Sequence, residues 1–138
     1  MALAVAALVP GVVVLDASAV LALVFHEAGA DQVRDVLGRA RVSSVNWHEI
    51  AAKLSDRGFS VEHLAFVLAN LPVEVIPVDR SDAEQAAALR ASTRPFGLSL
   101  GDRACLALGR ALDAPIYSAD TAWSKLPSEL GIKLVLIR

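Results

Sequence analysis

The chain has little cysteine, few aromatic residues and no excess of positive charge, and each shortage argues against a class of protein. A single cysteine among 138 residues excludes an internal disulfide and a zinc site built on several thiolates. Aromatic residues make up only 5% of the sequence, which disfavours an aromatic-rich β-sandwich. The net charge of −2 provides no overall field that attracts nucleic acid, so local groups would have to hold a polyanionic substrate.

Apolar residues are abundant, at 55% of the chain, and most of them are alanine, leucine and valine. This composition favours helices packed closely on a sheet. A chain of this length forms one ordinary domain, which buries about two-thirds of its unfolded surface. We therefore expect a single core.

The first 25 residues contain one charged side chain, Asp16, and superficially resemble a membrane or export segment. No lysine or arginine precedes the apolar run, although a signal peptide needs one. A membrane-spanning helix would bury Asp16 at a cost of about 2.5–3.5 kcal/mol, and Pro10 would interrupt it. We expect a cytoplasmic protein without membrane association, in which an apolar N-terminal extension (residues 1–11) precedes one domain (residues 12–138).

The most informative stretch surrounds Asp16. Residues 12–15 form a β-branched apolar run typical of a strand covered on both faces, and residues 17–25 have strong helix propensity. Open α/β sheets bind their ligands at the carboxyl ends of parallel strands, where such an aspartate would lie. The alternative is that Asp16 or Ser18 only caps the following helix.

The rest of the chain alternates strand and helix patterns, with further strands expected at residues 41–45, 73–78, 116–118 and 133–137. Helices are expected at residues 30–40, 46–57, 60–71, 82–92, 100–112 and 121–125, with loops at 94–97 and 127–131. Alternation of this kind predicts an α/β fold, in a single three-layer domain with a central, mostly parallel five-stranded sheet flanked by helices.

Three more acids, Glu49, Asp102 and Asp120, fall at junctions with helices, as Asp16 does. Asn46-x-x-Glu49 and Ser99-x-x-Asp102 also fit a capping box, which leaves a purely structural alternative open. Four clustered carboxylates would repel one another unless a cation neutralised them. Oxygen ligands without histidine or cysteine suit Mg²⁺ or Mn²⁺, and such ions support hydrolysis of phosphodiesters.

Four segments of the sequence resemble the motifs of PIN-domain ribonucleases, in particular the VapC-type toxins of toxin–antitoxin pairs. They are Leu15-Asp16-Ala17-Ser18, Asn46-x-x-Glu49, Leu98-Ser99-Leu100-Gly101-Asp102-Arg103 and Ser118-Ala119-Asp120-Thr121. The resemblance spans residues 12–137, and the third segment is its most specific part. The first acid lies later in this chain than is usual in the family, and Ser118 stands where threonine is more frequent.

The resemblance implies an Mg²⁺- or Mn²⁺-dependent endoribonuclease that acts on RNA and is blocked by a small cognate antitoxin. It implies four catalytic and metal-binding acids, Asp16, Glu49, Asp102 and Asp120. It adds three secondary site residues, Ser18, Ser118 and Thr121. Family members commonly pair symmetrically, and residues 46–71 carry more apolar surface than one core needs, so we expect a homodimer.

Two alternatives remain open: a receiver-like acidic metal-binding switch, and an inactive PIN module that only binds partners. A receiver domain would place paired acids after the first strand and a lysine late in the chain near the pocket. Here Asp16-Ala17-Ser18 lacks the pair of acids, and Lys133 begins a strand. The intact set of acids argues against an inactive module. Smaller hypotheses concern base stacking by Trp47 and Trp123, a general base at His48, and phosphate contacts by Arg41, Lys53, Arg94 and Arg103.

Overall fold

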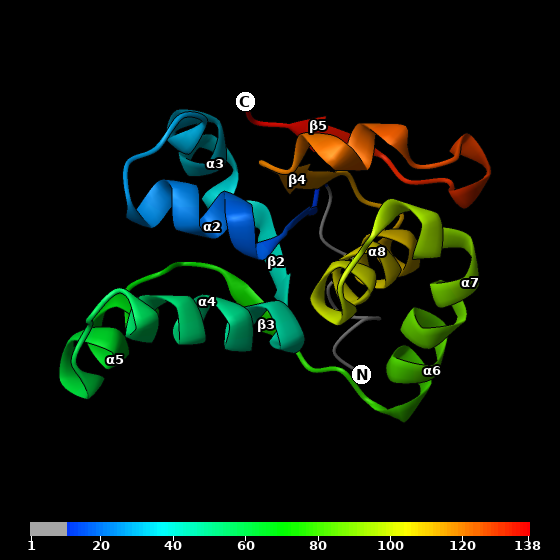
Figure 1. The fold of residues 1–138 in the computed structure, drawn as a ribbon. Coiled ribbons are helices and arrows are strands. Elements are labelled where there is room, and N and C mark those ends of the chain that lie inside the picture. The colour runs from blue at the N-terminus through cyan, green and yellow to red at the C-terminus, as the bar shows by residue number, and fades with distance from the viewer. Residues whose placement is uncertain (1–10) are drawn as a thin grey trace.

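The computed structural model describes residues 11–138, so the predicted extension, apart from Gly11, lies outside the described residues. Its centre is a five-stranded sheet in the order β3-β2-β1-β4-β5. All neighbouring strands pair in parallel (Figure 1). The strands are β1 (Val13–Leu15), β2 (Ala40–Ser43), β3 (Glu74–Ile76), β4 (Ile116–Ser118) and β5 (Leu134–Leu136). The predicted α/β class is confirmed, and the sheet is parallel throughout.

Helices cover both faces of this sheet. In Figure 1, α2 to α5 fill the left half of the view and α6 to α8 the right half. The α-helices are α2 (Ala17–Val24), α3 (Ala30–Val36), α4 (Ser44–Asp56), α5 (Val61–Ala69), α6 (Arg80–Ala88), α7 (Arg90–Thr93) and α8 (Leu100–Leu112). Short 3₁₀ helices are η1 (Leu37–Arg39), η2 (Arg94–Phe96), η3 (Thr121–Lys125) and η4 (Ser128–Leu130).

Strand β1 contributes to the cores on both sides of the sheet. Val13 and Leu15 belong to the core beneath α2, α3 and α4, whereas Val14 belongs to the core beneath α8. Successive side chains of a strand point to opposite faces, so an uninterrupted apolar run fills both cores. This pattern places the end of β1, and therefore Asp16, in the middle of the sheet's carboxyl edge.

Several boundaries differ from the sequence-based prediction. Helix α4 begins at Ser44 rather than residue 46, because the Ser43 side chain accepts a hydrogen bond from the Val45 amide and caps the helix. The predicted loop at residues 94–97 contains η2, and the predicted helix at 30–40 ends its α-helical part at Val36. The first difference matters for the site, because it places Asn46 inside a helix.

The hairpin of α4 and α5 is less exposed than its composition suggested. Four apolar side chains pack partly against the molecule's own core: Leu64, Val67, Leu68 and Leu71. Phe66 and Val61 remain outside, with 68% and 78% of their surface exposed. Among residues 11–138, no helix has the length and apolarity needed to cross a membrane.

Candidate active site

The four predicted acids line one pocket of ≈ 160 Å³. Asp16 follows β1, Glu49 lies on α4, Asp102 lies in the first turn of α8, and Asp120 follows β4. The pocket walls are completed by Ala17, Ser18, Leu21, Asn46 and Lys53. Helices α2, α4 and α8 approach one another around the middle of the view in Figure 1, and α4 contacts both of the others. Residues more than 100 positions apart therefore meet at the carboxyl edge of the sheet.

Asp16 both caps a helix and faces the pocket. Its Oδ1 accepts hydrogen bonds from the amides of Ser18 and Ala19, in the first turn of α2. Its Oδ2 accepts a bond of 2.7 Å from the Ser118 hydroxyl. Only 5% of Asp16 is exposed, and this burial raises the pKa of its carboxyl although the serine hydrogen bonds oppose the change. The capping interpretation and the site interpretation are thus compatible.

Two of the secondary residues connect the ends of β1 and β4. The Ser18 hydroxyl donates to Asp16 and accepts a 2.9 Å bond from the Ala119 amide. The Ser118 hydroxyl accepts a 3.0 Å bond from the Asp120 amide. These bonds fix the position of Asp16 relative to the segment that carries Asp120. Thr121, by contrast, is exposed and does not line the pocket.

Glu49 is held against α8 by Asn46. The Asn46 Nδ2 donates to Glu49 Oε1 at 2.7 Å and to the Gly101 carbonyl at 3.0 Å. Any side chain at Gly101 would collide with the Glu49 carboxyl group, so glycine permits this close approach. Burial raises the pKa of Glu49. The Asn46 hydrogen bond opposes that rise, the charges of Asp102 and Asp16 add to it, and Lys53 opposes it.

The two remaining acids also make local caps. Asp102 Oδ2 accepts from the Ser99 amide at 2.9 Å, and the Asp102 amide donates to Ser99 Oγ at 3.1 Å, which completes a capping box. Asp120 Oδ1 accepts from the Ala122 amide at 3.0 Å and caps η3. The capping-box alternative is therefore confirmed for Asp102. It is wrong for Glu49, because Ser43 caps α4 and Asn46 lies within the helix.

The donor set of the pocket fits a hard divalent cation. In the described part of the chain, Glu49 Oε2, Asp102 Oδ1 and Asp120 Oδ2 accept no hydrogen bond from the protein. Carboxylate oxygens of this kind are the ligands that Mg²⁺ and Mn²⁺ prefer. Across residues 11–138, however, no three His, Cys, Asp or Glu side chains are gathered closely enough to form a metal site. Binding would require the acidic side chains to turn toward one another.

The sequence patterns did not identify two residues of this site. Asn46 holds the Glu49 carboxyl group by a hydrogen bond, and Gly101 lets that carboxyl group lie close to α8. The spacing of Asn46 and Glu49 could have revealed the first, since residues three apart lie on the same face of a helix. His48 is exposed and outside the pocket lining. Trp123 is 1% exposed and belongs to the core beneath α8, which contradicts the base-stacking hypothesis for this residue.

Comparisons with known proteins agree with the architecture. The family model for the PIN domain matches residues 13–129. No curated protein sequence matches this chain closely enough to count as a relative. Among solved structures, a toxin–antitoxin complex from Klebsiella pneumoniae is similar, with a TM-score of 0.68 and 16% identity over 91% of this chain and 98% of that one.

Two further neighbours are VapBC structures bound to DNA. VapBC2 from Rickettsia felis, bound to a promoter fragment, matches with a TM-score of 0.69 and 15% identity over 92% of this chain and 99% of that one. VapBC from Salmonella typhimurium matches with a TM-score of 0.69 and 15% identity over 92% of this chain and 98% of that one. At these identities the likeness establishes the fold alone. The family match covers most of the chain, and the protein belongs to the PIN-domain family.

Proposed function

We propose that the protein is a metal-dependent endoribonuclease that cleaves RNA phosphodiesters in the cytoplasm as the toxin of a toxin–antitoxin system. The observation that carries this proposal is the meeting of Asp16, Glu49, Asp102 and Asp120 in one pocket of a PIN-family chain. Toxin–antitoxin complexes among its structural neighbours support the biological role. The intact acids also argue against an inactive binding module.

The acids have distinguishable roles in this proposal. Asp16, Asp102 and Asp120 would be the principal ligands of Mg²⁺ or Mn²⁺, with Glu49 as a further ligand or as the group that orients water. Such a cation, when bound, lowers the pKa of water and neutralises charge on the phosphate. Ser18 and Ser118 keep Asp16 aimed, because their hydrogen bonds fix both carboxylate oxygens. Thr121 is exposed and does not line the pocket, so the structure offers no support for a role of its side chain.

The proposed reaction is the attack of water on phosphorus, which breaks one P–O ester bond and releases an alkoxide that takes up a proton. Glu49 is suited to receive the proton of the attacking water, because Asn46 holds its Oε1 while Oε2 accepts no hydrogen bond from residues 11–138.

Cleavage of labelled single-stranded RNA tests the proposal. We expect cleavage with Mg²⁺ or Mn²⁺, none in EDTA, and at least about a hundredfold less with Asp16→Asn, because even the outer partners of metal ligands are worth about 10–100-fold. Asp56→Asn, on the exposed end of α4, is the matched control and should cleave normally. Equal cleavage by Asp16→Asn and wild type, or undiminished cleavage in EDTA, would refute the assignment.

An antitoxin partner follows from the same proposal. A positively charged side chain of such a partner would be attracted to the acidic pocket and would block it. Expression of the chain alone should be toxic, and coexpression of the neighbouring small gene should relieve the toxicity. Harmless expression of a protein that cleaves RNA would refute the toxin role while leaving the nuclease role intact.

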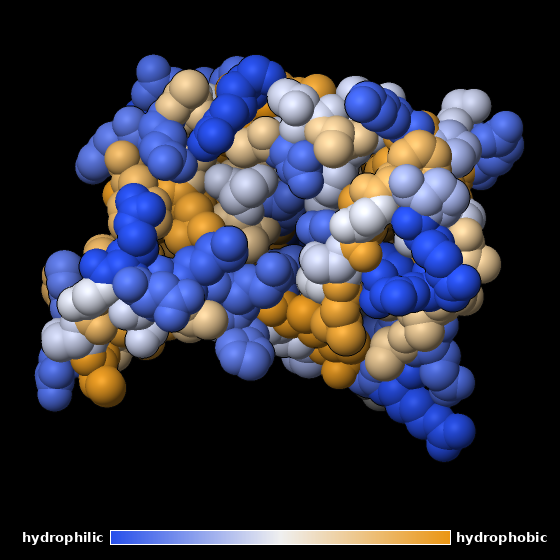
Figure 2. Space-filling model, in the orientation of Figure 1, coloured by the Kyte–Doolittle hydropathy of each residue, from blue (hydrophilic) through white to orange (hydrophobic). Residues whose placement is uncertain are grey.

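We also propose a homodimer. Apolar residues show between α4 and α6 on the face drawn in Figure 2. Val45, Val78 and Leu100 line a small hollow formed by α4, α6, α8 and the segment after β3. Leu100, beside the acidic pocket, is 67% exposed. A second copy covering this patch would bring two acidic pockets close together. Light scattering checks the assembly, and a fully active monomer at micromolar concentration would contradict it.

A further inference from the structure

The sequence offers four cations as candidate phosphate contacts, and the structure separates them. Arg41 is buried, with its Nε 2.9 Å from Glu74 Oε2. Arg103 is buried as well, and its Nη1 donates to the Leu98 carbonyl at 3.0 Å. Arg94 does not line the acidic pocket, whereas Lys53 does. Lys53 is therefore the candidate cation placed beside the acids.

Lys53 lies among carboxylates and yet forms no ion pair with any residue from 11 to 138. A glutamate four residues before a lysine on a helix is a favourable arrangement for pairing, and Glu49 has this position. Its carboxyl group is instead held by Asn46 and lies against Gly101 on α8. The contact that positions Glu49 thus leaves the Lys53 ammonium available.

We propose that Lys53 binds a phosphate of the RNA chain next to the one being cleaved. This inference rests on the proposed ribonuclease function and deepens it by naming a substrate-binding residue. Lys53 lines the pocket with the acids, and the rise of 1.5 Å per residue places its backbone about 6 Å further along α4 than that of Glu49. Its side chain is long and flexible. An ammonium with three donors binds non-bridging phosphate oxygens without reading the base. In a chain of net charge −2, this local contact supplies the attraction that the overall charge does not.

RNA binding by Lys53→Met is the first test, with Lys133→Met as the matched control. Lys133 is the same residue type, but it pairs with Asp113 after α8 and lies outside the pocket. Binding of a fluorescent single-stranded oligouridylate is measured by anisotropy in EDTA, so that the probe stays intact, at several salt concentrations. Lys53→Met should bind about three- to tenfold more weakly, and its salt slope should be smaller by about 0.7. The control should remain within about twofold of wild type, and Lys53→Arg should keep the wild-type slope.

Cleavage kinetics with Mg²⁺ or Mn²⁺ form the second test. If Lys53 contacts the phosphate equally in the bound and transition states, losing that contact in Lys53→Met should raise KM and leave kcat within about twofold of wild type. A fall in kcat at constant KM would mean that Lys53 acts through Glu49, and would overturn the proposal. Unchanged affinity and salt slope in Lys53→Met, or no RNA binding by wild type, would overturn it as well.

The two proposals fail in distinguishable ways. If wild type does not cleave RNA but Lys53→Met still weakens binding and lowers the salt slope, the nuclease assignment is wrong and the phosphate contact is supported. If wild type cleaves RNA and Lys53→Met matches it in affinity, salt slope and KM, the nuclease assignment is supported and the phosphate contact by Lys53 is wrong.

Discussion

The charges between strands β2 and β3 and those at the carboxyl edge of the sheet are arranged in opposite ways. Arg41, whose side chain is 7% exposed, pairs with Glu74, its partner in the register of the two strands. At the carboxyl edge, Asp16, Glu49, Asp102 and Asp120 face one pocket without forming an ion pair with any cation in residues 11–138. In the first arrangement the negative charge is balanced by a cation of the same chain. In the second, the negative charge is left for a bound ligand to balance.

This difference explains why the acids are informative about function. Burial and the neighbouring charges raise the pKa of Glu49, and burial raises that of Asp16, so the fold holds both carboxylates in unfavourable surroundings. Perturbed groups of this kind gather where a ligand or a reaction requires them. The Arg41–Glu74 pair, in which the arginine is buried and the glutamate is partly exposed, needs no such explanation because each charge has its partner.

Among variants that keep all four acids, Gly101→Ala is expected to have the largest effect, because it disturbs the acidic edge of the sheet. The new methyl group would collide with the Glu49 carboxyl and displace it from Asn46. We expect about 10–100-fold lower ribonuclease activity, as for other disturbed partners of metal ligands. Stability should change little, because the displaced atoms end a flexible side chain and alanine adds up to about 1 kcal/mol of helix propensity.

Gly38→Ala is the control for this variant, because a methyl group there would meet no atom within 4 Å. Cleavage assays and thermal melting of both variants check the prediction. Normal activity in Gly101→Ala would show that the position of Glu49 against α8 is unimportant for the reaction.

The sequence predicted much of this edge because its signals are local. A β-branched run ending at Asp16, and acids at later junctions, suffice to place the four carboxylates once the sheet is known to be parallel. The sequence could not reveal that Asn46 bridges Glu49 and the Gly101 carbonyl, because that bond joins residues 55 positions apart. Nor could it reveal that Arg41 lies beside Glu74, since this depends on the register between β2 and β3.

The sequence also predicts the start of α4 two residues too late. Ser43 and Asn46 are both good capping residues, and tertiary packing selects between them.

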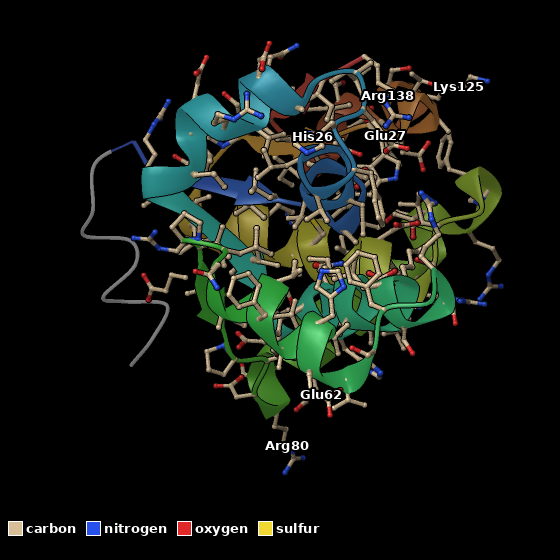
Figure 3. All side chains as sticks on the ribbon, turned by 90° about the vertical axis from the view of Figure 1, so that its left-hand side faces the viewer. His26, Glu27, Glu62, Arg80, Lys125 and Arg138 are labelled. Carbon is tan, nitrogen blue, oxygen red and sulfur yellow. The ribbon has the colours of Figure 1, made fainter. Side chains whose placement is uncertain are left out.

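The second prediction concerns loss of the ion pair between Arg41 on β2 and Glu74 on β3. Glu74→Gln keeps the shape of the side chain but leaves Arg41 buried without its counter-charge. We expect the free energy of unfolding to fall by about 2 kcal/mol, below the usual cost of breaking a fully buried pair because Glu74 is partly exposed. Glu84→Gln, which removes an exposed pair with Arg80, should change it by less than about 0.5 kcal/mol. Arg80 projects into solvent in Figure 3. Urea denaturation of both variants measures the difference, and equal losses would remove the distinction between the two pairs.

The smallest expected effect is a change in how stability depends on pH. Burial in the folded state raises the pKa of Asp16 above its ordinary value, so between the unfolded and folded pKa values the folded protein holds more protons than the unfolded chain. Without metal, the contribution of Asp16 to the free energy of unfolding is therefore largest below the unfolded pKa, and it is lost as pH rises through the folded pKa. Glu49 has a raised pKa and contributes in the same direction. Asp16→Asn removes the larger buried charge while an amide oxygen can still cap α2, so its stability in EDTA should fall less steeply from acidic to neutral pH. Urea denaturation across this range compares the two slopes, and a variant slope as steep as that of wild type would mean that the Asp16 charge is not strained by the fold.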